Sequence, residues 1–291
     1  MTKFVSLSTI ATVMLVSSAA APVTPSGLYR VWVSGHGTDG ASCGSPTSPC
    51  RTLQYAHDNI VLASGEIDIL DPAGYGAVTI TKALSIVNDG VGTAGVQQAT
   101  AGLAAITINA GASDAIYLRG LNIDGLGTGD KGILLNSGGS LAVTNCVVRH
   151  FINYGILMQP SSGTTLFSIS NTIISDNSSA GIYVKPTGTA SAKGTITGVE
   201  ASRNAYGIYV DGSFSTGTAT FVLVSDANAS NNGSTGIFVG SARLAITRST
   251  ASGNGDGVYV NSGTVYTYGD NRILGNGSTD VHGVLTSVTG N

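Results

Sequence analysis

A short phrase that returns along the chain constrains the fold more than any other feature. It is a glycine followed by alternating apolar residues, and it begins at Gly132, Gly155, Gly181, Gly207, Gly236 and Gly257. Successive phrases are separated by 23, 26, 26, 29 and 21 residues, and a period of about 20 to 50 residues is typical of a solenoid or repeat array. One phrase supplies only a short strand, so the units must stack to bury a core.

The phrases and the segments between them predict a coil of short strands joined at polar corners. In the phrase at Gly181, Ile182 and Val184 share one face of a strand and Tyr183 takes the other. A second alternating segment lies upstream in each unit, as at 166–170, 220–224 and 243–247. Asparagine and glycine tolerate the left-handed backbone conformation, so we expect corners at the recurring asparagines. These are Asn145, Asn171, Asn177, Asn204, Asn232, Asn254 and Asn276.

Aligning the repeats on these asparagines defines two rows of small and aliphatic residues that suit a narrow interior. The first row contains Cys146, Thr172, Val199, Ala227, Ser249 and Asn271. The second row, two residues further on, contains Val148, Ile174, Ala201, Ala229, Ala251 and Ile273. Stacked units would bring the members of each row about 4.8 Å apart, the spacing of neighbouring strands in a sheet.

This repeat resembles that of right-handed parallel β-helix proteins of the pectate-lyase-like superfamily. The resemblance covers most of the chain, and it extends to an amino end with the segments Pro49–Gln54 and Gly65–Gly76. It implies an all-β fold, a right-handed parallel β-helix with a short N-terminal capping helix. The scaffold carries lyases, hydrolases, epimerases, adhesins and structural proteins, so it implies no single activity.

Composition agrees with one continuous solenoid and excludes some partners. Apolar residues make up 42% of the chain and charged residues only 10%, so an alternating pattern can bury a core. The net charge is -3 without a basic run, so we expect no nucleic-acid partner. We also expect no cofactor, and the pattern does not indicate an oligomeric state.

The beginning of the chain predicts export. Lys3 precedes an apolar stretch from Ile10 to Val16, and small residues follow at Ala19–Ala21. This is typical of a cleavable signal peptide over 1–21, and the stretch is too short to cross a bilayer. We therefore expect a secreted or periplasmic protein without a membrane span in its mature form. We divide that form into a cap with a disulfide loop and helix over 22–66 and a β-helix over 67–291.

Two features define the predicted cap. Cys43 and Cys50 flank a turn-rich loop, and in an exported protein such a pair favours a disulfide over free thiols or a metal site. Segment 51–63 has helical periodicity, with Gly65 as its stop, and His57 is then a helix residue rather than a ligand. The third cysteine, Cys146, lies on the first inward row, where we expect it to behave as a small apolar residue.

The sequence contains few candidates for catalysis. No coil gathers three acids, so we expect no metal site, and the paired carboxylates of a glycosidase are not evident. The best polar cluster is a column of His150, Asp176 and Arg203 at one corner. It has two interpretations, a small acid–base site or an exposed ladder of charges.

The middle residues of the repeat phrases form an outward column that suggests binding. Four successive aromatics are candidate binding residues, and they follow two leucines: Leu134, Leu157, Tyr183, Tyr209, Phe238 and Tyr259. Such a stripe marks a binding surface, or it stabilises the sheet by cross-strand stacking. The favoured hypothesis is a secreted, non-catalytic protein that recognises a polysaccharide or cell-envelope surface. The alternatives are a polysaccharide lyase or glycoside hydrolase, and an adhesin-like structural protein.

Overall fold

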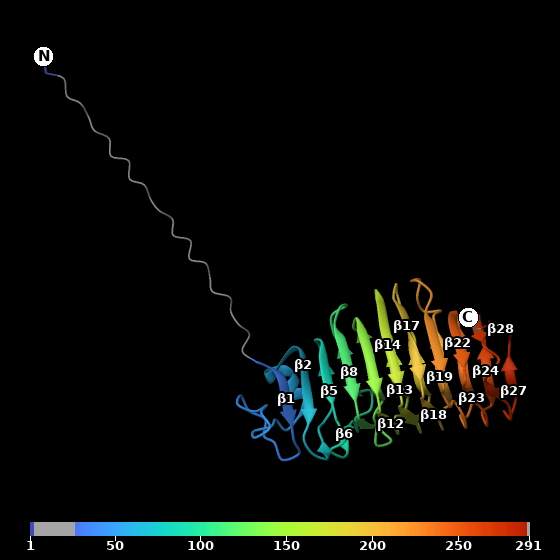
Figure 1. The fold of residues 1–291 in the computed structure, drawn as a ribbon, viewed down its shortest axis with the longest axis horizontal. Helices are drawn as coiled ribbons and strands as arrows, with labels where there is room; N and C mark the ends of the chain where they lie inside the picture. Colours follow the sequence, from blue (N-terminus) through green and yellow to red (C-terminus); the bar gives the residue numbers. More distant parts are fainter. Residues whose placement is uncertain (3–26, 290–291) are drawn as a thin grey trace.

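The chain winds as a parallel β-solenoid whose coils follow the sequence from one end to the other (Figure 1). The computed structural model describes residues 1–2 and 27–289, so the predicted signal peptide lies outside the described residues except for its first two. Every pairing between two named strands in the described part is parallel. The all-β fold predicted from the repeat is therefore confirmed.

Three sheets and one strand pair form the sides of the coil in the described residues. The longest, here the long sheet, has 11 strands among residues 27–289. Its strands are β1 (Leu28–Val33), β2 (Val61–Ile69), β5 (Leu84–Val87), β8 (Ala115–Arg119), β11 (Ser140–Thr144), β14 (Thr164–Ser170), β17 (Ser191–Thr197), β20 (Phe221–Ser225), β22 (Ala242–Thr247), β25 (Gly263–Thr267) and β28 (Leu285–Ser287). Since β1 and β2 pair with each other, the segment predicted as the cap contributes to the same sheet as the coils.

The second sheet, here the middle sheet, contains the repeat phrases. Within the described chain its nine strands are β4 (Val78–Ile80), β7 (Ala104–Asn109), β10 (Lys131–Ser137), β13 (Tyr154–Met158), β16 (Ala180–Val184), β19 (Tyr206–Asp211), β21 (Thr235–Gly240), β24 (Asp256–Val260) and β27 (Thr279–His282). The short sheet consists of β3 (Ala73–Gly74), β6 (Ala94–Gln97), β9 (Leu121–Asp124), β12 (Val147–Arg149), β15 (Ile173–Ser175) and β18 (Glu200–Ser202). The pair β23 (Thr250–Ala251) and β26 (Arg272–Ile273) continues this side.

The interior rows follow the predicted register. Val148 pairs with Ile174, and Ile174 pairs with Ala201 in the next strand. Ala251 pairs with Ile273 further along the same side. All members of the second row are buried except Ile273, which is half-buried in the last coil. Cys146 is also buried, and burial raises the pKa of its thiol to about 11.

The corners differ from the prediction at five asparagines. Asn145 and Asn171 do adopt positive φ, at 54° and 47°. The other predicted corner asparagines do not adopt it. Asn177, Asn204, Asn232 and Asn254 stack in the interior, where each amide bonds to the next asparagine of the row, and the half-buried Asn276 ends the row by bonding to Asp280. The left-handed residue is the one before each of them, as at Asp176 and Arg203. Stacked amides satisfy one another, which is why a polar side chain is tolerated inside the coil.

The predicted helix exists but is shorter than expected. It consists of α1 (Leu53–Tyr55) and a π-helical turn, η1 (Ala56–Ile60), and Thr52 Oγ1 accepts a hydrogen bond from Tyr55 N. Ala63 and Gly65, predicted as the end of the helix, belong to β2 instead. Pairing with β1 pulls this segment into the sheet, and a side chain at Gly65 would collide with the Tyr29 carbonyl oxygen at 2.7 Å. His57 is a buried helix residue, as expected.

Candidate functional site

The outward column of the repeat phrases forms a continuous stripe on the middle sheet. Leu134 pairs with Leu157, and the register then continues through the four predicted aromatics to His282. We call this row the outer stripe: Leu134, Leu157, Tyr183, Tyr209, Phe238, Tyr259 and His282. The structure therefore brings all four predicted binding residues together on one face.

The rings of the outer stripe stack on one another along the solenoid axis. Tyr183 and Tyr209 have ring centroids 4.3 Å apart, and Phe238 and Tyr259 are stacked with an interplanar angle of 8°. Much of the ring-face area of the outer stripe is therefore covered by neighbouring rings of the same stripe. Tyr183 is only 6% exposed, and burial raises the pKa of its hydroxyl, as do the neighbouring Tyr209 and Asp211.

Two tyrosines beside the outer stripe were missed in the sequence. Tyr154 and Tyr206 each precede the glycine of a repeat phrase and occupy positions two coils apart, with the buried Ala180 between them. Tyr154 is tilted by 52° against Tyr183, and Tyr206 meets Phe238 edge-on at 85°. Because these rings are half-buried and tilted, they offer surface that the stacked rings do not. Their position immediately before the glycine was the signal available in the sequence.

Polar side chains border the other side of the stripe. Gln159 Nε2 donates to Asn136 Oδ1 at 3.0 Å, and Asn136 Nδ2 donates to Asn109 Oδ1 at 2.9 Å. The next residue in this position is Lys185, whose Nζ lies 4.2 Å from the ring centroid of Phe214. Aromatic rings beside planar amides and a cation can contact both the apolar faces and the hydroxyl groups of a sugar.

The corner cluster only partly matches the predicted His150, Asp176 and Arg203 column. Arg203 makes a two-pronged ion pair with Asp176, at 2.8 and 2.9 Å. His150 Nδ1 instead lies 3.1 Å from Oδ1 of Asp124, while Oδ2 of Asp124 accepts from Arg149 Nε. A hollow of about 340 Å³ adjoins the cluster, lined by Gly127, His150, Phe151, Ile152, Asp176 and Ser178.

The electrostatics of this corner do not suit an acid catalyst. The hydrogen bond from Arg203 lowers the pKa of Asp176. Burial alone would raise the pKa of Asp124, but bonds from Leu126 N, His150 and Arg149 hold it below its usual value. A general acid needs a carboxyl that keeps its proton near neutral pH. Both carboxylates are instead charged partners in ion pairs, as the charge-ladder interpretation expects.

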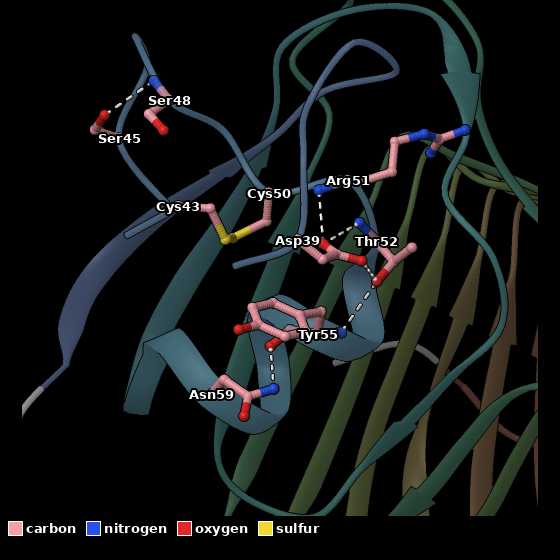
Figure 2. Close-up of a disulfide and its surroundings, with 9 residues drawn as sticks. All are labelled: Asp39, Cys43, Ser45, Ser48, Cys50, Arg51, Thr52, Tyr55 and Asn59. Atoms are coloured by element: carbon pink, nitrogen blue, oxygen red, sulfur yellow. Dashed lines mark hydrogen bonds between the residues drawn. A yellow bond between two sulfur atoms is a disulfide. The ribbon is translucent and has the colours of Figure 1, made fainter. Parts of the chain in front are cut away.

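The predicted disulfide is present in the cap (Figure 2). Cys43 and Cys50 are bonded, with their Cα atoms 4.9 Å apart. Asp39 lies beside them, so these three residues form the one group in residues 27–289 with metal-ligand spacing. The sulfurs are engaged with each other, and Asp39 accepts from Arg51 N and from Thr52 N and Oγ1. Asp39 therefore connects the disulfide loop to the start of the helix, and the group has the bonding of a structural contact rather than of a metal centre.

Comparison with known proteins assigns the family. The family model described as right handed beta helix region matches residues 131–291, more than half of the chain. The chain belongs to the right-handed β-helix family. This agrees with the resemblance to pectate-lyase-like proteins that the repeat indicated.

Two solved structures resemble this chain at low identity. A pectate lyase, Pel9A, is 16% identical, with a TM-score of 0.59 over 91% of this chain and 79% of that one. ORF18 of Geobacillus virus E2 is 13% identical, with a TM-score of 0.49 over 77% of this chain and 52% of that one. At these identities the likeness concerns the fold alone. No curated protein sequence matches the chain.

Within residues 1–2 and 27–289, no helix has the length and apolarity needed to cross a bilayer.

Proposed function

We propose that this β-helix protein is secreted and recognises a polysaccharide or cell-envelope surface without catalysis, through the outer stripe and its two flanking tyrosines. The observation that carries the proposal is the unbroken row from Leu134 to His282 on one face, in which Leu157 and Tyr183 are buried and the other members keep exposed surface. Contiguous apolar rows on an outer surface commonly mark binding sites. Coils repeat at about 4.8 Å, so the stripe presents similar contacts at regular intervals, which suits a polymer.

The tilted tyrosines are the proposed primary contacts. Tyr154 and Tyr206 retain accessible ring surface and a hydroxyl, a combination that packs on a sugar ring and donates to its oxygens. Tyr183 contributes indirectly, because its ring packs against Tyr154 on one side and Tyr209 on the other. The amides of Asn136 and Gln159 supply hydrogen bonds along the edge.

The test uses a double variant, Tyr154→Ser with Tyr206→Ser, in a retention assay on purified envelope fragments and a panel of insoluble polysaccharides. We expect retention to fall at least tenfold, while the melting temperature changes little because both side chains are partly exposed. The matched control is Tyr117→Ser with Tyr266→Ser, which removes two outward tyrosines from the long sheet.

Three outcomes contradict the proposal. The wild-type protein could bind none of the surfaces, or both double variants could lose retention equally. New reducing or unsaturated ends in the bound polysaccharide would show catalysis and favour a hydrolase or lyase instead.

A further inference from the structure

Asp130 contacts both a lysine amine and an asparagine amide from two successive coils. The carboxylate lies just before β10, where one oxygen, Oδ2, accepts from Lys131 Nζ. Its other oxygen, Oδ1, accepts from Nδ2 of Asn153, just before β13 in the next coil. One carboxylate therefore holds the amine and the amide side by side.

The carboxylate of Asp130 is buried, and the two groups that it contacts are half-buried. Asp130 is 6% exposed. Its backbone N donates to the Leu103 carbonyl at 3.0 Å, and its carbonyl accepts from the backbone N of Asn153 at 3.2 Å. The side chain of Lys131 is 18% exposed. Such fixed proximity raises the effective concentration of two reacting groups by a large factor, on the order of 10⁵ M or more in well-oriented cases.

We propose that Lys131 and Asn153 join in an intramolecular isopeptide bond, with Asp130 as the proton-transfer group. Lys131 Nζ, after giving a proton to Asp130, attacks Cγ of Asn153 and forms a new C–N bond. Asp130 passes protons to the amide, the Cγ–Nδ2 bond breaks, and Nδ2 leaves as ammonium. The products are an amide that links the two side chains, one ammonium ion and a regenerated Asp130 carboxylate, so no oxidant or cofactor is consumed.

Before the proposed reaction, Asp130 and Lys131 form an ion pair. Burial alone raises the pKa of Asp130, but hydrogen bonds from Lys131 and Asn153 outweigh it and hold that pKa below its usual value. The carboxylate is therefore charged at rest, and it takes up the lysine proton only in a minor fraction of the molecules. A buried ion pair of this kind reacts through its minor neutral form, which suits a reaction that occurs once per molecule.

Other polar clusters in the described residues lack one of the three groups. Asp124, Asp176 and Asp226 pair with arginines, and a guanidinium does not act as a nucleophile. Lys82 donates to backbone carbonyls of His57 and Val61. Asp280 bonds to the amide of Asn276, but no lysine lies within ion-pair distance of it among residues 27–289.

The experiment is peptide mass spectrometry of a tryptic digest of the folded, then reduced and denatured, full-length protein. A linked Lys131 resists trypsin, so residues 120–149 and 150–193 should appear as one branched peptide, lighter than their sum by one ammonia. Lys131→Arg keeps the charge and the ion pair but should yield separate peptides. Asn153→Ala should do the same, and Asp130→Asn should reduce the linked fraction at least tenfold.

The control variant is Asp226→Asn, which removes a carboxylate from an exposed ion pair elsewhere and should leave the link intact. The proposal is overturned if the folded wild-type protein releases 120–131 and 132–149 as separate peptides with no branched product. Linkage that persists in Asp130→Asn would overturn the assigned role of Asp130. Circular dichroism and melting of each variant identify any that fail to fold, and Lys131→Arg decides the outcome in that case.

Discussion

A buried asparagine amide has two N–H donors and one oxygen acceptor that need partners, and stacking in this solenoid supplies them. Asn204 Nδ2 donates to the carbonyls of Ile174 and Ser202, both at 3.1 Å. Its oxygen accepts from both N and Nδ2 of Asn177. One side chain thus bonds the coil before it, its own coil and, through Asn232, the coil after it.

Removing the Asn204 amide should destabilise the interior of the coil. Asn204→Ala leaves the donors of Asn177 and the carbonyl of Ile174 without partners in the interior, so we expect a loss of unfolding free energy on the order of 3 kcal/mol. Urea denaturation followed by circular dichroism measures it. Asn228→Ala, an outward asparagine nearby, is the control and should change stability by less than about 0.5 kcal/mol. Equal losses in the two variants would show that the interior amides are not the cause.

At the scale of an element, the capping helix depends on one uncharged histidine. His57 Nε2 accepts a hydrogen bond from Thr81 N at 3.1 Å, so that nitrogen carries no proton. Burial lowers the pKa of His57; the hydrogen bond with Asp58 opposes this shift, and the charge on Lys82 adds to it, so the pKa stays below its usual value. Lys82 also holds the end of the helix, because its Nζ donates to the carbonyls of His57 and Val61, each at 2.6 Å.

This arrangement predicts acid sensitivity of the cap. Because the pKa of His57 is lower in the folded state, the stabilisation is complete above the unfolded pKa of about 6.5 and is lost as pH falls through the folded value. We therefore expect the unfolding free energy to decrease from pH 7 to pH 5. His57→Gln keeps an acceptor for Thr81 N but does not titrate, so its slope over this range should be smaller. Identical slopes in the two proteins would contradict the assignment.

At the scale of the whole solenoid, the first and last coils of residues 27–289 differ. The N-terminal edge strand β1 is covered by the disulfide loop, with Trp32 N bonded to the Gly44 carbonyl and Ser34 N to that of Cys50. In the last described coil, Leu274 is 61% exposed and Val284 is 75% exposed. Stability in a solenoid is close to a sum of contacts between neighbouring repeats, so a coil with one neighbour is the first to open.

Hydrogen exchange should show the difference in local stability between the cap and the last described coil. We expect amides of residues 272–289 to exchange fastest among the coils, those of β16 and β19 slowest, and the cap to be intermediate. Reduction of the Cys43–Cys50 disulfide should accelerate exchange in the cap without affecting the middle coils. A cap that exchanges faster than the last coil before reduction would contradict the prediction.

The coil and its register were predictable because alternation and repeat spacing act over the whole chain. The pairing of Ala251 with Ile273 follows from counting, as does the stripe through Tyr183 and Tyr209. The interior asparagines were not predictable, because asparagine locally favours turns. It is stable in the interior only when stacked amides satisfy its hydrogen bonds. The contact of Asp130 with Asn153 has a similar origin, because it joins residues almost one coil apart.

The row of interior amides has a direction. Each asparagine from Asn177 onward donates toward the following coil, and the last, Asn276, donates to a carboxylate oxygen of Asp280. A duplicated coil inserted between two existing ones would find a donor on one side and an acceptor on the other, so the row would simply lengthen. A coil placed beyond Asp280 would find the amide donor of Asn276 already bonded to the Asp280 carboxylate. The number of coils can therefore change by internal duplication, while the coil that carries Asp280 keeps its place as the terminator of the row.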